Sequence, residues 1–166
     1  MSQMKTSVLD FNLIDPVEAG EEWAVAFDSP YNVVEIYIDK VEIRDIVRPL
    51  EEAYMKESEP SLLRMGHEQY YSHLWPKLLY DNLHYARMRD PYFENDDCLL
   101  LGCVECGIPE CWSFSIKVRE DEKYIYWYDF EHLYREWEYG LIFRFEKRQY
   151  EAAMRKLHKF ISQQMR

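Results

Sequence analysis

The sequence predicts an α+β fold: an antiparallel β-sheet arranged as a meander, with an amphipathic C-terminal helix and additional helices from the middle of the chain. Apolar and polar residues alternate in several short runs, most clearly at 111–118 and 123–130, as in half-buried strands. The loops between these runs are short, as in antiparallel neighbours. The segment from about 147 to 164 instead spaces its apolar residues as an amphipathic helix does.

In the N-terminal part of the chain, the apolar and polar pattern predicts strands at 7–14, 22–28 and 32–39, separated by turns with Pro and Gly. A helix should follow at 43–56. We expect it in two pieces, because Pro49 has no N–H group with which to continue the helical hydrogen bonds.

In the middle of the chain, the sequence predicts two helices, at 67–75 and 76–88, with Pro76 in the first turn of the second helix. The pattern then changes to strands, which we expect at 97–103, 111–118, 123–130 and 140–146. No repeat, low-complexity segment or linker divides the chain, so residues 1–166 predict a single domain.

Charge and hydropathy exclude several functional classes. The net charge of −11 argues against nucleic-acid binding, which depends on Lys and Arg replacing the counterions of phosphates. No apolar run approaches the roughly 20 residues of a transmembrane helix, so we expect no membrane partner. The N-terminus lacks the features of a signal peptide. We therefore expect a cytoplasmic protein with reduced cysteines.

The charge is unevenly distributed along the chain. Residues 1–60 hold 14 acidic and 5 basic residues, a net −9, whereas residues 141–166 hold 2 acidic and 7 basic residues, a net +5. The simplest interpretation is that the basic terminal helix and the acidic N-terminal part attract each other.

Three cysteines, Cys103, Cys106 and Cys111, lie close together in a stretch with the shape of a metal knuckle. Structural zinc takes four ligands, and Cys98 would lie roughly 16 Å from Cys103 along an extended strand. A remote His would have to complete the site. The alternative is that the reduced cysteines only support a compact turn, with no cofactor bound.

This segment resembles an uncharacterised bacterial family of small acidic proteins with a C-x-C-G-x-x-G-C-W-like turn followed by a W-x-D-F strand. The matching residues are Cys103, Cys106, Gly107, Cys111, Trp112, Trp127, Asp129 and Phe130. This chain has C-x-x-C in place of C-x-C, and Glu110 in place of Gly. The family has no assigned activity, so the resemblance implies a shared fold and no reaction.

Aromatic residues are concentrated in 124–139. Alternation places Ile125 and Trp127 toward a core and three tyrosines across the sheet, where an uncovered face would form a contact patch. The predicted binding surface comprises Tyr124, Tyr126, Tyr128, Trp127 and Asp129.

No nucleotide-binding glycine loop, nucleophile elbow or H-E-x-x-H motif is present, so we do not predict an enzyme. Our leading hypothesis is a non-enzymatic protein-binding domain with an acidic, Tyr/Trp-rich surface. Its partner would be a protein with a basic surface, such as a nuclease toxin that the chain neutralises, or a second copy of the chain. The alternatives are a small zinc-binding protein and an enzyme that uses Asp129 with His132.

Overall fold

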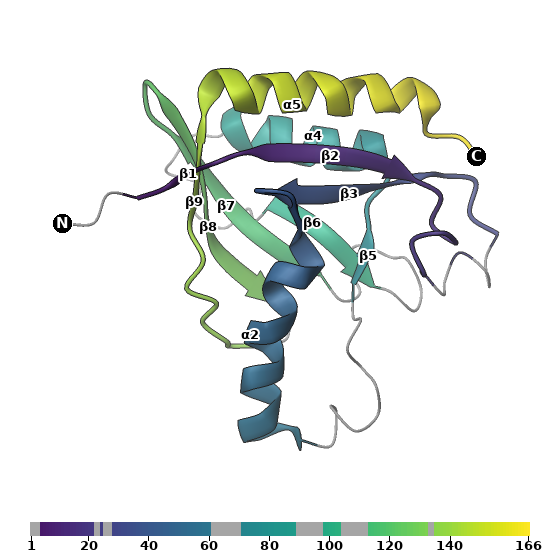
Figure 1. Ribbon diagram of the computed structural model, residues 1–166. Helices are drawn as coiled ribbons and strands as arrows, with labels where there is room; N and C mark the ends of the chain where they lie inside the picture. Colours follow the sequence, from purple (N-terminus) through teal and green to yellow (C-terminus); the bar gives the residue numbers. More distant parts are fainter. Residues whose placement is uncertain are drawn as a thin grey trace.

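The structure is a computed structural model that describes residues 4–21, 24, 28–60, 71–88, 98–103, 113–132 and 135–166. Within these residues, two β-sheets and three α-helices form an α+β fold, which confirms the predicted class (Figure 1). Sheet A contains, in spatial order, β1 (Thr6–Ser7), β9 (Phe143–Glu146), β8 (Tyr124–His132), β7 (Phe114–Glu120), β6 (Cys98–Cys103) and β5 (Tyr71–His73). Sheet B contains β2 (Leu9–Ile14), β3 (Val33–Ile38) and β4 (Val41–Glu42).

The C-terminal half forms the predicted meander. Strands β6, β7, β8 and β9 pair antiparallel with their neighbours in chain order. Sheet A as a whole is mixed, however, because β1 pairs parallel with β9, placing Thr6 opposite Arg144. The expectation of a purely antiparallel sheet was therefore wrong at this edge.

The predicted strand 7–14 belongs to both sheets. Its pairing changes at Val8, after which Leu9–Ile14 runs antiparallel to β3. Val8 is held by the β3–β4 turn: its N–H donates to Asp39 Oδ1 at 2.9 Å, and its carbonyl accepts from the Asp39 N–H at 2.9 Å. Burial alternates without interruption from Ser7 through the exposed Val8 to Asn12, so a period-two pattern could not show the change of partner.

Strand β8 contains a bulge that decides which residues face the core. Ser115 pairs with Glu131 and Lys117 with Tyr128, so β8 has one residue more than β7 across this interval. Asp129 lies there with φ of 48°, in the left-handed region that Asp tolerates. The extra residue shifts the alternation, and both Trp127 and Phe130 are consequently buried.

The helix predicted at 67–75 is wrong where the structure describes it, because Tyr71–His73 is β5 and pairs antiparallel with β6; residues 67–70 lie outside the described part. The side chains of Tyr71 and His73 reach Glu51 and Glu42 respectively. Residues two apart share a side in a strand but point about 200° apart in a helix. These distant partners and the pairing with β6 override the local helical pattern.

Helix α2 (Ile43–Ser58) is continuous, contrary to the expected break at Pro49. Pro49 is exposed, so the Asp45 carbonyl that loses its intrahelical donor can bond water. At the N-terminus, the Glu42 carboxylate accepts a hydrogen bond from the Arg44 N–H and caps the helix.

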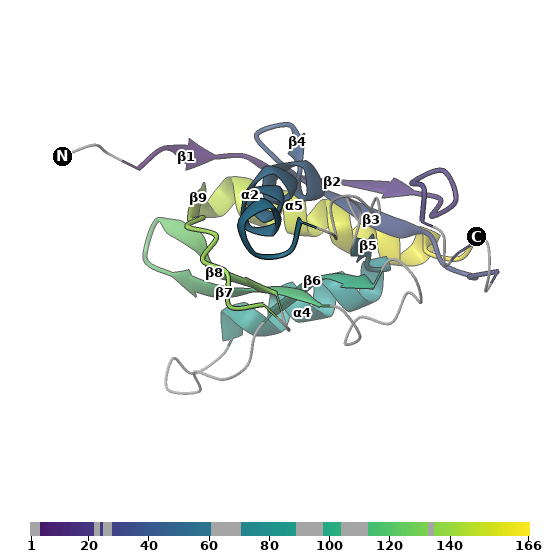
Figure 2. The same cartoon turned by 90° about the horizontal axis from the view of Figure 1, so that it is seen from below.

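The other helices are α4 (Pro76–Met88) and α5 (Lys147–Phe160), followed by the 3₁₀ turn η1 (Ile161–Gln163). Viewed from below, α2 lies nearly end-on between the strands of the two sheets (Figure 2). One hydrophobic cluster takes residues from both sheets and each described α-helix, including Phe11, Val47, Leu83, Trp127 and Tyr150. The predicted strand 22–28 falls almost wholly outside the described residues.

The expected attraction between the chain's acidic and basic ends is confirmed by two ion pairs. Lys156 Nζ lies 2.8 Å from Asp10 Oδ1, and Arg166 Nε lies 2.8 Å from Asp15 Oδ2. These pairs hold the C-terminal helical segment against β2 and the turn that follows it.

Candidate functional site

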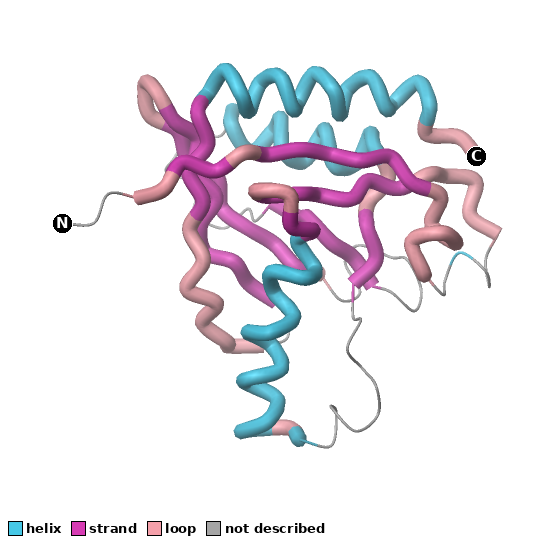
Figure 3. The backbone as a smooth tube through the Cα atoms, viewed as in Figure 1, coloured by secondary structure: helices cyan, strands magenta, loops and turns pink. Residues whose placement is uncertain are grey.

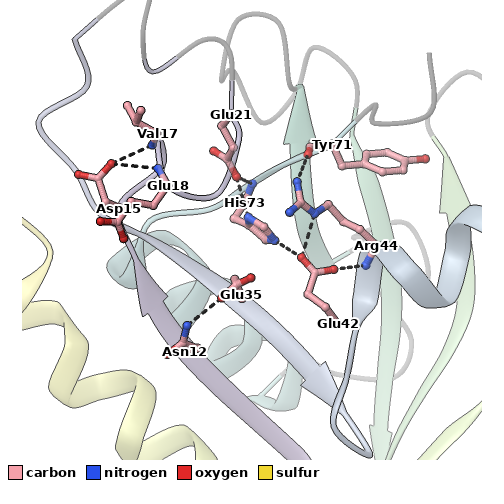
Figure 4. A network of polar contacts seen from close by, with 10 residues as sticks. All are labelled: Asn12, Asp15, Val17, Glu18, Glu21, Glu35, Glu42, Arg44, Tyr71 and His73. Carbon is pink, nitrogen blue, oxygen red and sulfur yellow. Dashed lines mark hydrogen bonds and ion pairs between the residues drawn. The ribbon is translucent and has the colours of Figure 1, made fainter. Parts of the chain in front are cut away.

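A buried polar network is centred on His73 of β5, which lies between two carboxylates (Figure 4). His73 Nδ1 is 2.6 Å from Glu21 Oε1, and the same oxygen accepts the His73 backbone N–H at 2.7 Å. The other ring nitrogen, Nε2, contacts Glu42 Oε1. The His73 and Glu21 side chains are 0% exposed.

The geometry makes His73 an imidazolium. A carboxylate oxygen faces each ring nitrogen, so both nitrogens must donate a hydrogen bond. Burial by itself lowers the pKa of His73, but the hydrogen bonds to Glu21 and Glu42 outweigh it and raise the pKa. For Glu42, burial by itself raises the pKa of the carboxyl group. The hydrogen bond and charge of His73, together with Arg44, outweigh burial and lower the pKa of Glu42 to about 2.

Arg44 extends this network toward a second buried carboxyl group. Its Nε donates to Glu42 Oε1 at 2.8 Å, and its Nη1 donates to the Tyr71 carbonyl at 3.2 Å. The Tyr71 hydroxyl donates to Glu51 Oε2 at 2.6 Å, and the Tyr139 hydroxyl donates to the same oxygen at 2.9 Å. Burial raises the pKa of Glu51 despite both hydroxyl donors.

The network links four parts of the chain: the turn before residue 22, the start and middle of α2, β5 and the segment before β9. Glu42 lines a hollow of about 290 Å³ on the surface, together with Tyr37 and Lys40, but His73 lies behind it with no exposed area. A carboxylate with a pKa of about 2 is a weak base. The network therefore serves as an electrostatic clamp that holds β5 against α2. Its residues lie too far apart in the sequence for the network to have been predicted from it.

The structure does not bring together the two residues of the enzyme hypothesis. The Asp129 side chain is 54% exposed and lies 3.5 Å from Lys117 Nζ. His132 is buried beside the Tyr71 ring, at 5.9 Å between centroids. Burial and the charge of Arg135 lower the pKa of His132 to about 4, so its ring is neutral near pH 7.

The predicted zinc site lies mostly outside the described part of the chain. Cys103 ends β6 and is buried, with a free thiol, whereas Cys106 and Cys111 are not among the described residues. Within the described residues, no group of three His, Cys, Asp or Glu side chains has an arrangement that could hold a metal ion. The zinc site stays a prediction.

The predicted aromatic surface divides between the two faces of β8. Trp127 is fully buried, packs edge to face on Phe145 at 5.2 Å, and donates its indole N–H to the Tyr150 hydroxyl at 3.1 Å. It therefore belongs to the core, and its assignment to a binding surface was wrong. The alternation that made 124–130 a strand carries this information, since Trp127 shares its parity with the buried Ile125.

The tyrosines Tyr124, Tyr126 and Tyr128 lie on the opposite face, where arginines cover part of their rings. The Arg119 guanidinium lies 4.7 Å from the Tyr126 ring and 5.4 Å from the Tyr128 ring. Arg144 lies 4.4 Å from the Tyr124 ring. Acidic groups lie on the same face: the Tyr126 hydroxyl donates to Asp121 Oδ2 at 2.9 Å, and the Asp129 side chain is exposed. The face is therefore a Tyr/Arg surface of mixed charge, in which the tyrosine rings are partly covered by arginines.

An acidic aromatic surface occurs elsewhere, where α2 meets the segment before β9. The rings of Tyr54 and Trp137 stack with centroids 5.4 Å apart and planes 5° apart. The Tyr54 hydroxyl donates to the Glu138 carbonyl at 2.7 Å and accepts from the Glu138 N–H at 3.1 Å. Glu57, Glu136 and Glu138 are exposed around these rings.

We refer to Tyr54, Glu57, Glu136, Trp137 and Glu138 as the acidic aromatic patch. Sequence reasoning identified 124–139 as rich in aromatic residues but missed the patch, because Tyr54 and Glu138 are 84 positions apart. No periodic signal joins two such segments.

Two further observations bear on function. Among the described residues, no helix has both the length and the apolar character that crossing a bilayer requires. Comparisons with protein-family models, curated proteins and solved structures give no match.

Proposed function

We propose that this chain is a non-enzymatic protein-binding domain that contacts a protein with a basic surface through the acidic aromatic patch. The observation that carries this proposal is the ring stack of Tyr54 and Trp137, which lies among exposed carboxylates. Trp and Tyr are the residues most often responsible for binding energy at protein interfaces, and opposite charge steers partners together.

The patch is held in place before any partner binds. The two hydrogen bonds between the Tyr54 hydroxyl and the Glu138 backbone fix the 135–139 segment against α2. The Arg135 guanidinium lies over the Trp137 ring, 5.1 Å from its centroid. Arg135 also forms an ion pair with Glu59. A fixed surface loses less conformational entropy on binding than a mobile one.

The carboxylates of the patch are available to a partner. Within the described parts of the chain, no Lys, Arg or His forms an ion pair with Glu57, Glu136 or Glu138. In a chain of net charge −11, this arrangement favours a partner that presents Lys or Arg side chains.

The test is affinity capture from the protein's own cells with wild-type and variant chains, followed by quantitative mass spectrometry. In the first variant, Glu136→Lys with Glu138→Lys reverses the charge of the patch. Its matched control, Glu18→Lys with Glu122→Lys, makes the same charge change at two exposed positions elsewhere. We expect a basic partner to be lost by about tenfold or more with the first variant and retained with the control.

Two further variants identify the surface. Trp137→Ala should also abolish capture of that partner, whereas Tyr126→Ala on the Tyr/Arg face of β8 should leave it unchanged. Loss with Tyr126→Ala alone would transfer the interface to the predicted β8 surface. The proposal would be refuted if the purified partner bound the wild-type chain and the Glu136→Lys, Glu138→Lys variant with the same affinity.

A further inference from the structure

A basic groove runs between α4 and α5, which lie side by side (Figure 3). It has a volume of about 480 Å³. Its walls carry Tyr80, His84 and Arg87 from α4, and Arg155, His158 and Lys159 from α5. The volume is in the range of small-molecule binding sites, which span roughly 300–1,000 Å³.

The two helices run antiparallel, which sets the order of groups along the groove. At one end, Arg87 Nη2 lies 3.4 Å from Glu151 Oε1. At the other end, the Tyr80 ring contacts the His158 ring edge to face, at 4.9 Å between centroids. The same Tyr80 ring stacks on His84 at 5.5 Å.

Among the Lys and Arg residues that line the groove, Arg87 alone has carboxylate partners within the described part of the chain, Glu120 at 3.1 Å and Glu151 at 3.4 Å. Glu151 is the acidic residue of the groove, and it already pairs with Arg87. Arg155 and Lys159 are exposed and form no ion pair with any described carboxylate. By contrast Lys156, their neighbour on α5, pairs with Asp10.

Helix polarity accounts for part of this charge. A cation in the last turn of a helix interacts favourably with the helix dipole, which accounts for the position of Lys159. Arg155 lies before the last turn and faces the groove, so the dipole does not explain it.

We propose that this groove binds a small phosphate-bearing molecule. Arginine donates paired hydrogen bonds to phosphate oxygens, lysine adds a compact positive charge, and histidine rings supply further N–H donors. The Tyr80 ring and the Met154 side chain give the same groove an apolar wall. A long polyanion is disfavoured, because the rest of the chain is strongly acidic.

The first test is calorimetric titration of the full chain with pyrophosphate at low ionic strength. We expect one saturable site, weakened about tenfold or more by Arg155→Ala and by Lys159→Ala. Lys156→Ala removes the same charge from the same helix outside the groove and should change the affinity by less than about twofold. Absence of saturable binding, or equal weakening by all three variants, would overturn the proposal.

The second test needs no variant protein in the titration. Met154 lines the groove, so its methyl resonance in the wild-type chain should shift with added pyrophosphate and saturate with the calorimetric affinity. Its assignment comes from a separate Met154→Leu spectrum. An unshifted Met154 resonance at saturation would place binding elsewhere. A Glu-rich peptide that saturates the groove while pyrophosphate does not would replace the phosphate ligand by an acidic protein segment.

Discussion

Replacing His73 by Gln tests whether the clamp between β5 and α2 depends on an imidazolium. Gln has nearly the same length, but its amide donates from the nitrogen end only and it carries no charge, so it cannot donate to a carboxylate on both sides as an imidazolium does. It would leave the buried Glu21 carboxylate without the His73 cation, and would leave Glu42 with Arg44 alone. We expect the variant to fold with a lower free energy of unfolding.

The magnitude follows from Glu42. Its pKa is lowered from 4.5 to about 2, which corresponds to about 3 kcal/mol of stabilisation of the carboxylate; His73 is the larger cause and Arg44 supplies the rest, so about 3 kcal/mol is an upper value for the loss of His73 from this pair. His73 and Glu42 share this interaction, so it is counted once. Removing one partner of a buried ion pair costs about 3–5 kcal/mol, in agreement with this value. We therefore expect His73→Gln to lower the free energy of unfolding by up to about 3 kcal/mol near pH 6.

The pH dependence gives the prediction a sign. The pKa of His73 is raised in the folded chain, so its stabilisation is complete below the unfolded pKa of about 6.5 and is lost as pH rises through the folded pKa. Above about pH 6.5, the wild-type free energy of unfolding should fall by up to about 1.4 kcal/mol per pH unit from this group. In His73→Gln this component should be absent, and the two curves should converge.

Urea denaturation between about pH 6 and pH 9, followed by the tryptophan fluorescence of the chain, to which the buried Trp127 contributes, measures both quantities. His84→Gln is the matched control, because His84 is exposed and should retain the wild-type slope. A loss below about 1 kcal/mol near pH 6, or an unchanged slope in His73→Gln, would show that His73 is neutral in the folded chain.

Three further predictions concern a turn, the core and the cysteines. Lys40 follows Asp39 in a two-residue hairpin turn with φ of 67°, so Lys40→Gly should raise the free energy of unfolding by about 1 kcal/mol in urea denaturation. Trp127→Ala should lower it by about 3–5 kcal/mol because Trp127 is fully buried, whereas Tyr126→Ala should cost less than about 1 kcal/mol. Elemental analysis of protein purified without chelator tests the zinc site predicted at Cys103: about one equivalent of zinc would establish it, and less than about a tenth of an equivalent would refute it.

The strands that could be predicted are those whose alternation matches their burial. In β8, Ile125 and Trp127 are buried and Tyr124 and Tyr126 are not, so a period of two was visible in the sequence. Helix α5 could be predicted because its apolar spacing also matches its burial: Tyr150, Met154 and Leu157 are buried at helical spacing.

What could not be predicted depends on contacts between distant segments. The residues of β5 have a helical pattern in the sequence, but Tyr71–His73 pairs with β6. The Tyr71 side chain contacts Glu51 of α2, and the His73 side chain contacts Glu42, which caps α2. The candidate site follows the same rule. Tyr54 was part of a predicted helix and Trp137 part of a predicted aromatic stretch, but only the tertiary fold stacks the two rings.

The terminal helix explains how a strongly acidic chain comes to have a basic groove. Basic residues flank the buried stripe of α5 on two sides, and the folded chain treats the sides differently. Toward β2, Asp10 neutralises Lys156. Toward α4, the nearest acidic residue of the groove, Glu151, is already paired, so Arg155 and Lys159 keep their charge. Neutralising the remaining side would have required carboxylates on α4 opposite Arg155 and Lys159, and that helix contributes Tyr80, His84 and Arg87 to the groove instead.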